Sequence, residues 1–262
     1  MRDRTLIVAN WKMNFTVQEA SLFVHKLDKK IKNHRNVEVV LAPSILALQT
    51  LNLQIDHRKF RLAVQNLYWR DEGAYTGEIS AHQLHGLVRY AIIGHSERRH
   101  LFGDRPKEVR AKVQAAVRNE IIPILCVGES ASEKASGETM DVLRDQVTGG
   151  LANLTAEEVE NIVIAYEPVW AISSGKDFAT HAAASTKDAT AAAKAIRSYV
   201  AHMFGKKVAQ SIRILYGAST NTGNAGDFLS SSQIDGLLVG GASLNLEQFA
   251  GIVEAAHKRD KA

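Results

Sequence analysis

The stretch Thr5-Leu-Ile-Val-Ala-Asn-Trp-Lys-Met-Asn14 begins with a short apolar run and ends with polar side chains. The run Thr5–Ala9 has the length and composition of a buried strand. Asn10 and Lys12 follow it, so an amide and a cation stand at one strand end. Parallel α/β folds bind anionic ligands at the carboxyl ends of their strands. This segment therefore predicts a parallel sheet with an anion-binding site at its edge.

Seven further apolar runs of the same kind recur along the chain. They are Val37–Ala42, Phe60–Val64, Tyr90–Ile93, Ile121–Val127, Ile162–Ala165, Ile212–Leu215 and Leu237–Val239. Each run is short and almost continuous, as expected of strands that are buried on both faces. Helical patterns separate the runs, and strands that alternate with helices indicate a parallel sheet. We expect closure into an eight-stranded α/β barrel, with a doubly wound sheet as the alternative.

Several helix starts can be predicted from local signals. Thr16-Val-Gln-Glu19 and Thr155-Ala-Glu-Glu158 each fit a capping box. Asp104 followed by Pro106 predicts the start of another helix. The alanine-rich stretch Ala182–Ala195 predicts a surface helix.

The bulk composition limits the class of protein. The chain has 262 residues, which fits one α/β barrel of the usual size, and no Pro/Gly/Ser-rich linker divides it. We therefore expect a single domain over residues 1–262.

The net charge is +4, but the basic residues are scattered apart from His257-Lys258-Arg259. A nucleic-acid surface needs a clustered basic patch with aromatic residues, so we expect no nucleic-acid partner.

The only cysteine, Cys126, lies inside the apolar run Ile121–Val127. It cannot form a disulfide within the chain, which fits a reducing compartment, and we expect a structural thiol rather than a nucleophile. The run Leu6–Ala9 is too short for a secretory signal, and no apolar run approaches the length of a membrane span. We therefore expect a cytoplasmic protein without a membrane partner.

Four stretches carry a resemblance that spans almost the whole chain. They read NWKMN at Asn10–Asn14, YAIIGHSERR at Tyr90–Arg99, AYEPVWAISSG at Ala165–Gly175 and ILYGAS at Ile214–Ser219. Together they resemble the triosephosphate isomerase family. The resemblance implies a single (β/α)8 TIM barrel that interconverts dihydroxyacetone phosphate and D-glyceraldehyde 3-phosphate in glycolysis and gluconeogenesis. It also implies that the reaction needs no cofactor.

The resemblance assigns the proton transfers to Glu167 and His95. Glu167 would move a proton between neighbouring carbons through an enediolate, and His95 would donate to the substrate carbonyl as a neutral imidazole. Triosephosphate isomerase is itself the standard example of a glutamate base that works with a neutral histidine. A helix that starts after His95 would disfavour the imidazolium form.

The resemblance gives three further polar residues roles around the substrate. Lys12 would stabilise the enediolate and also touch the phosphate. Asn10 would hold the stem of Lys12 or a substrate oxygen. Glu97 would pair with Lys12 in the empty site, and an ion pair of Glu97 with Arg98 or Arg99 is the alternative.

The phosphate would be held by backbone N–H groups rather than by an arginine. The residues that would supply them are Ser173, Ser219, Gly240 and Gly241, with the Ser219 hydroxyl as an extra donor. The glycine pair follows the eighth apolar run, where the phosphate sites of barrels gather. The lid over the site would include Pro168, Trp170, Ser174, Gly175 and Lys176.

The segment Gly73–Glu78 resembles the loop by which members of the family reach into a neighbouring subunit. Tyr75, Thr76 and Gly77 would form its tip, and Thr76 would touch the Asn10–Lys12 region of a second copy. The resemblance thus implies a homodimer. An ordinary surface hairpin bounded by glycines is the alternative.

The chain departs from the family pattern in the lid and in the loop after the seventh strand. Ser173 and Ala218 stand where glycines are usual, and one residue is inserted after Lys176. Hinges absorb backbone rotation, so we expect altered lid kinetics and phosphate affinity with intact acid–base chemistry. A barrel that binds phosphorylated ligands without turnover is an alternative, as is another phosphosugar isomerase or synthase.

The chain has neither a cysteine pair nor a histidine spacing typical of metal ligands, so we expect no metal site. The glycine fingerprint of dinucleotide-binding folds is also absent.

Overall fold

The computed structural model describes residues 4–172 and 184–259. Eight parallel strands form a closed barrel, and the last strand pairs with the first. The strands are β1 (Thr5–Asn10), β2 (Val37–Ala42), β3 (Phe60–Val64), β4 (Tyr90–Ile93), β5 (Ile122–Val127), β6 (Val163–Tyr166), β7 (Arg213–Tyr216) and β8 (Gly236–Val239). Closure confirms the barrel and excludes the doubly wound sheet, since no strand is left at an edge.

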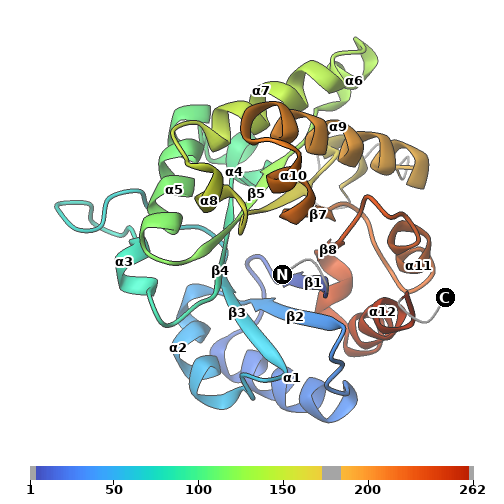
Figure 1. The fold of residues 1–262 in the computed structure, drawn as a ribbon. Helices are drawn as coiled ribbons and strands as arrows, with labels where there is room; N and C mark the ends of the chain where they lie inside the picture. The colour runs from blue at the N-terminus through green and yellow to red at the C-terminus, as the bar shows by residue number, and fades with distance from the viewer. Residues whose placement is uncertain (1–3, 173–183, 260–262) are drawn as a thin grey trace.

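The helices lie around the outside of the strands (Figure 1). The α-helices are α1 (Val17–Lys30), α2 (Ile45–Gln54), α3 (Ala81–Leu84), α4 (Ser96–Leu101), α5 (Pro106–Arg118), α6 (Ala131–Ala135), α7 (Thr139–Leu151), α8 (Ala156–Val159), α9 (Thr186–Phe204), α10 (Lys206–Ser211), α11 (Ala225–Leu229) and α12 (Leu246–Lys258). Two short 3₁₀ helices, η1 (Val169–Ala171) and η2 (Gly241–Leu244), follow β6 and β8. Among the described residues, no helix has the length and apolar character needed to cross a membrane.

The two predicted capping boxes are confirmed. The Thr16 hydroxyl accepts from the Glu19 amide at 3.3 Å, and the Glu19 carboxylate accepts from the Thr16 amide at 2.8 Å. The hydrogen bond from the Thr16 amide also lowers the pKa of Glu19. The second capping box, at Thr155, starts a helix of only four residues, α8.

The predicted helix start at Pro106 is also confirmed, because α5 begins there and Arg105 occupies the cap position. Asp104 accepts from Arg98 and Lys112.

One helix prediction needs correction. The helix expected over Ala182–Ala195 begins at Thr186 and runs to Phe204. It is not confined to the surface, because a face that includes Ala189, Ala192, Ala193, Ile196 and Val200 is buried.

Side chains along each strand alternate between the barrel interior and the helices. In β1, Leu6 and Val8 belong to the cluster inside the barrel, whereas Ile7 and Ala9 pack in the layer under the helices. The same alternation puts Val163 and Ala165 of β6 inside. Because side chains repeat every second residue, Asn10 and Glu167 are the next inward positions. The alternation thus aims these two residues into the mouth, the end of the barrel where the strands finish.

The opposite end of the interior is closed by three polar side chains, which we call the floor triad: Glu38, Tyr90 and Arg213. The Tyr90 hydroxyl donates to Glu38 Oε1 at 2.8 Å. Arg213 donates to Glu38 Oε2 at 2.8 Å and to the Tyr90 hydroxyl at 2.7 Å. Tyr90 and Arg213 are buried, and burial raises the pKa of Tyr90 to about 12. Each member of the triad therefore satisfies the other two away from water.

Candidate active site

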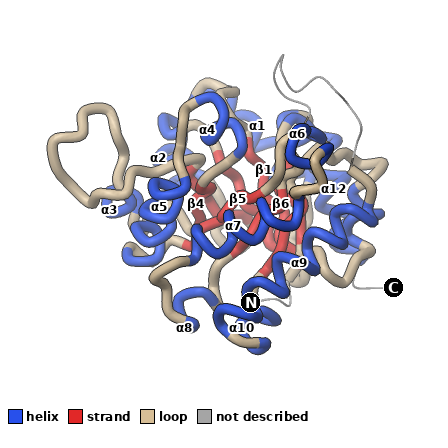
Figure 2. Tube along the Cα trace, turned by 90° about the horizontal axis from the view of Figure 1, so that it is seen from above, coloured by secondary structure: helices blue, strands red, loops and turns tan. Residues whose placement is uncertain are grey.

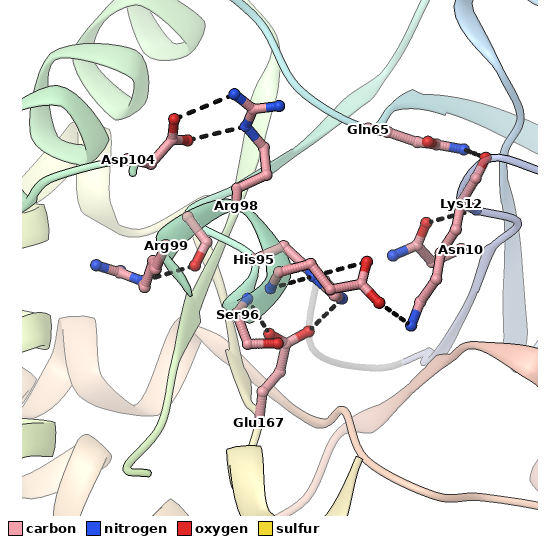
Figure 3. A network of polar contacts seen from close by, with 11 residues as sticks. Asn10, Lys12, Gln65, His95, Ser96, Arg98, Arg99, Asp104 and Glu167 are labelled. Atoms are coloured by element: carbon pink, nitrogen blue, oxygen red, sulfur yellow. Dashed lines mark hydrogen bonds and ion pairs between the residues drawn. The ribbon is translucent and has the colours of Figure 1, made fainter. Parts of the chain in front are cut away.

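A cleft of about 740 Å³ opens at the mouth of the barrel. Asn10, Lys12, His95 and Glu167 line it, although they come from the ends of β1, β4 and β6. Figure 3 shows these four side chains turned toward one another. The side wall holds further residues that follow β7 and β8, namely Gly217, Ser219, Gly240 and Gly241. One cleft therefore combines a carboxylate, an imidazole, an ammonium group and glycine-rich backbone.

The two carboxylate oxygens of Glu167 have different surroundings. The residue is only 1% exposed. The Ser96 amide donates to Oε2 at 3.1 Å. Oε1 lies 3.2 Å from His95 Nε2 but makes no well-directed hydrogen bond within the described part of the chain. One oxygen is thus held by backbone, and the other retains acceptor capacity in the cleft.

Two glycines make room for Glu167. A Cβ atom at Gly128 would lie 1.9 Å from the carbonyl oxygen of Glu167. A Cβ atom at Gly217 would lie 2.9 Å from the Cγ atom of Glu167. Neither glycine has a positive φ, so the requirement is close approach and not backbone freedom. A side chain at Gly217 would press on the Glu167 side chain, and one at Gly128 would press on its backbone.

His95 precedes helix α4 and caps it with its ring. The Glu97 amide donates to Nδ1 at 3.2 Å, so Nδ1 presents a lone pair and carries no proton. The ring is then neutral with its proton on Nε2, the nitrogen that faces Glu167. The N-terminus of α4 also disfavours a positive charge on this ring. His95 is therefore built to donate a hydrogen bond from Nε2.

Lys12 is held in a strained backbone conformation, with φ at 52°. Its amide donates to Asn10 Oδ1 at 3.1 Å, and its carbonyl accepts from Gln65 at 2.8 Å. Its ammonium group lies 2.7 Å from Glu97 Oε1, which is the ion pair expected for the empty site. The alternative partners of Glu97 are otherwise engaged, Arg98 with Asp104 and Arg99 with backbone carbonyls. Asn10 thus orients Lys12 through its backbone.

The backbone expected to hold phosphate lies beside Lys12. A Cβ atom at Gly240 would be 3.6 Å from Lys12 Cε. Gly241 begins a single 3₁₀ turn, η2, and α12 starts after it. The amide and hydroxyl of Ser219 both donate to the Ala171 carbonyl, at 3.3 and 2.8 Å. Ser173, the fourth expected contributor, lies outside the described residues.

The base of the expected lid is anchored to a buried carboxylate. The Trp170 indole donates to Glu129 Oε1 at 2.8 Å, and the Tyr166 hydroxyl donates to the same carboxylate at 3.1 Å. The Lys134 ammonium lies 3.3 Å from the centre of the Trp170 ring. Pro168 joins this anchored turn to Glu167. Ser174, Gly175 and Lys176 lie outside the described residues.

Ala218 causes no backbone strain in this conformation, because it is absent from the described residues with positive φ. Its methyl group would raise the energy of the backbone only if this peptide turns over to a positive φ. The change in lid kinetics therefore stays a prediction.

The loop between β3 and α3 extends away from the barrel (Figure 2). Its expected tip holds Tyr75, Thr76 and Gly77, and Gly77 has φ at 89°. A second cleft, of about 860 Å³, lies next to Lys12 and is also lined by Met13 and Leu46. Met13 is 98% exposed and Leu46 is 77% exposed. A protruding loop thus occurs on the same chain as a cleft with two strongly exposed apolar side chains.

No group of three or more histidine, cysteine or acidic residues within residues 4–172 and 184–259 could hold a metal ion. Cys126 is buried, and this burial is the main cause that raises the pKa of its thiol well above the usual value. The nearby charge of Glu167 raises the pKa further. A neutral buried thiol is a poor nucleophile, which agrees with the structural role expected for it.

Several residues around the site receive no role from the sequence. They are Ser96, Gly128, Glu129 and Gly217. A signal for the glycines exists, because Gly128 and Gly217 stand two residues after the inward-facing Cys126 and Leu215. Period-two alternation therefore identifies them as positions at the mouth. The contacts of Ser96 and Glu129 depend on the three-dimensional arrangement of neighbouring strands.

Comparison with known proteins agrees with the site. A family model described as "Triosephosphate isomerase" matches residues 5–256. The triosephosphate isomerase of Dictyoglomus turgidum is 42% identical over 253 residues, which cover 96% of this chain and 99% of that protein. That of Thermoanaerobacter sp. (strain X514) is 42% identical over 251 residues, which cover 95% and 98%. That of Clostridium perfringens (strain SM101) is 40% identical over 252 residues, which cover 95% and 99%.

Proposed function

Because the chain belongs to the triosephosphate isomerase family, we propose that the cleft at the mouth of the barrel is its active site. The enzyme interconverts dihydroxyacetone phosphate and D-glyceraldehyde 3-phosphate, a step of glycolysis. The observation that carries the assignment of residues is the convergence of Asn10, Lys12, His95 and Glu167 on one cleft. A lone buried cysteine fits a reducing compartment, so we also propose a cytoplasmic location.

Glu167 is the proposed base. Its carboxylate removes a proton from the carbon next to the substrate carbonyl and returns it to the neighbouring carbon. The Ser96 amide holds one oxygen, which supports proton transfer through the other, Oε1. A buried carboxylate that is fixed in this way needs little reorganisation before it reacts.

His95 and Lys12 are the proposed stabilisers of the enediolate that forms between the two proton transfers. The Nε2–H group of neutral His95 donates to the developing oxyanion and shuttles a proton between the two oxygens. The Lys12 ammonium adds positive charge at the same cleft. Its ion pair with Glu97 at 2.7 Å supports a role for Glu97 in orienting Lys12 before the substrate binds.

The phosphate of the substrate is proposed to lie beside Gly240 and Gly241, within reach of Lys12. The proximity of Lys12 Cε to Gly240 supports this position. Backbone N–H groups after β8 would bind the anion without an arginine. Ser219 would join them once its donors leave the Ala171 carbonyl.

A coupled assay with glyceraldehyde 3-phosphate tests the proposal directly. We expect Glu167→Gln to lower kcat by at least about 100-fold, the low end for loss of a general base. Glu157→Gln on α8 is the matched control, since this exposed glutamate lies before β6 and away from the mouth. A Glu167→Gln variant with near-normal turnover would remove Glu167 from its role. A wild-type protein that binds a phosphorylated ligand but turns nothing over would favour the binding-only alternative.

We further propose that the protein is a homodimer. The tip of the loop at Tyr75, Thr76 and Gly77 would enter the 860 Å³ cleft of a second copy, next to Lys12. The exposure of Met13 and Leu46 in that cleft supports a surface that a second copy covers.

Light scattering after size exclusion should give twice the chain mass for the wild type. Thr76→Arg, which puts a charge on the tip, should shift the protein toward a monomer with lower kcat. A wild-type monomer with full activity would contradict the proposal.

A further inference from the structure

Two neighbouring arginines of helix α4 are used in different ways. Arg98 forms a paired interaction with Asp104, with N–O distances of 3.0 and 3.1 Å. Arg99 leaves the helix in another direction (Figure 3). Its Nε donates to the Gly94 carbonyl at 2.7 Å, and its Nη2 donates to the Cys126 carbonyl at 3.0 Å. No ion pair between Arg99 and a carboxylate occurs among the residues that the structure describes.

The two carbonyls belong to the strand ends that surround Glu167. Gly94 follows β4 and directly precedes His95, whereas Cys126 lies near the end of β5 and two residues before Gly128. One guanidinium group therefore ties the end of β4 to the end of β5. Arginine can do this because its planar fork presents several N–H donors in a fixed arrangement.

Gly94 is shaped to accept this arginine. It has φ at +69°, and a Cβ atom there would lie 2.8 Å from Arg99 Nη2. Glycine at this position thus permits both the turn after β4 and the close approach of the guanidinium. The glycine of the Gly-His-Ser-Glu-Arg-Arg string and its second arginine form one structural unit.

The unit formed by Gly94 and Arg99 supports the backbone on both sides of Glu167. On the β4 side it fixes the turn that carries the Ser96 amide, which donates to Glu167 Oε2 at 3.1 Å. On the β5 side it fixes the segment that leads to Gly128, whose Cα lies against the Glu167 carbonyl. Burial lowers the pKa of Arg99, and the charge of nearby Glu167 opposes that shift. The negative charge of Glu167 therefore favours the charged form of the buried guanidinium.

We propose that Arg99 is a positioning residue for the catalytic base. It acts through Glu167 by holding the two backbone segments against which that carboxylate rests, and it does not touch the substrate. The inference rests on the proposed role of Glu167 and adds a residue to the machinery that orients it.

The test compares kcat, KM and thermal stability for Arg99→Met, with Arg197→Met as the matched control. Arg197 also donates to backbone carbonyls, from α9 near β7, and it is absent from the lining of the active-site cleft. It differs from Arg99 in that it also pairs with the buried Asp235 at 2.9 Å, so its variant should lose at least as much stability. We expect both variants to melt at lower temperature. Only Arg99→Met should lose kcat, by about 10- to 100-fold, because a small misplacement of a catalytic group costs that much. Its KM should stay within about twofold of wild type, since the phosphate site is untouched.

A double variant separates positioning of Glu167 from general damage. In a Glu167→Gln background, Arg99→Met should lower kcat by less than about threefold further, because the group it positions is already lost. An equal loss in both backgrounds would overturn the proposal, as would an Arg99→Met variant with wild-type kcat.

If Arg99→Met does not fold, the kcat of Arg99→Lys tests the proposal instead. Lysine keeps the charge but cannot bridge both carbonyls, so we expect a kcat loss of about three- to tenfold. Unchanged kcat in Arg99→Lys, together with unchanged kcat in a guanidinium-free Arg99→Gln, would overturn the proposal. Full activity of Glu167→Gln alone would instead overturn the assignment of the base, which is a separate failure.

Discussion

Both ends of the barrel interior hold buried polar and charged groups. Only at the floor do these groups satisfy the hydrogen-bonding capacity of one another. At the floor, Glu38, Tyr90 and Arg213 form a closed triangle with distances of 2.7 to 2.8 Å. At the mouth, Glu167 Oε1 has no well-directed hydrogen bond among the described residues, and the Lys12 backbone is strained. The floor is complete without a ligand, whereas the mouth retains hydrogen-bonding capacity that a substrate can use.

This difference shows how one scaffold separates stability from reactivity. Polar groups that satisfy one another stabilise a fold but have little left to offer a ligand. Buried groups with unused hydrogen-bonding capacity lower the stability of a fold, and proteins retain them where they act on a substrate. The mouth and the floor should therefore respond differently to substitution, and each prediction below tests that separation.

The largest expected effect on stability is at the floor. Arg213→Met leaves the largely buried Glu38 carboxylate without its hydrogen-bonded cation, so we expect the free energy of unfolding to fall by about 3 kcal/mol. The kcat of the folded protein should stay near the wild-type value. Urea denaturation at fixed protein concentration and the coupled assay give the two numbers. A loss of kcat with unchanged stability would contradict the separation.

The reverse pattern is expected for Lys12→Met at the mouth. Loss of the ammonium group should lower kcat/KM by about 100-fold or more, equivalent to roughly 3 kcal/mol, with a higher KM as well as a lower kcat. Stability should change little, because the ion pair with Glu97 is partly exposed. The exposed Lys26 of α1 provides the control variant, Lys26→Met. An unchanged KM would show that Lys12 does not meet the phosphate.

The smallest of the three effects is a pH dependence that belongs to the floor. Burial raises the pKa of Tyr90 to about 12, above a value of about 10 for an unfolded tyrosine. The unfolded chain therefore loses this proton first, so the stabilisation is complete below about pH 10 and falls as pH rises toward 12. The loss should reach about 2 to 3 kcal/mol in the wild type and be absent in Tyr90→Phe. Stability curves that fall in parallel for the two proteins would show that Tyr90 is not responsible.

The sequence predicts the strands well because each strand is buried on both faces. All eight apolar runs are strands with ends within one residue of the prediction. The helix predicted at Ala182–Ala195 agrees less well with α9, since alanine is compatible with both the exposed and the buried face and does not mark where α9 ends. The order of strands and the family resemblance together predict the side chains at the strand ends.

The supporting contacts around Glu167 could not be predicted in the same way. Ser96, Gly128 and Gly217 come from three different segments, and the stagger of the closed barrel decides which of them touch the carboxylate. The local sequence does not predict that Arg98 pairs with Asp104 while Arg99 donates to the Cys126 carbonyl. These relations depend on distances between strand ends, which local sequence does not encode.

Glu167 is the group proposed to transfer a proton at the mouth of the barrel. Proton NMR of dihydroxyacetone phosphate in deuterium oxide measures that transfer directly, because a proton removed by a carboxylate can exchange with solvent before it returns. We predict that the wild type introduces deuterium at the carbon next to the carbonyl, and that Glu167→Gln does so at least about 100-fold more slowly. Exchange at the wild-type rate in Glu167→Gln would show that another group removes the proton.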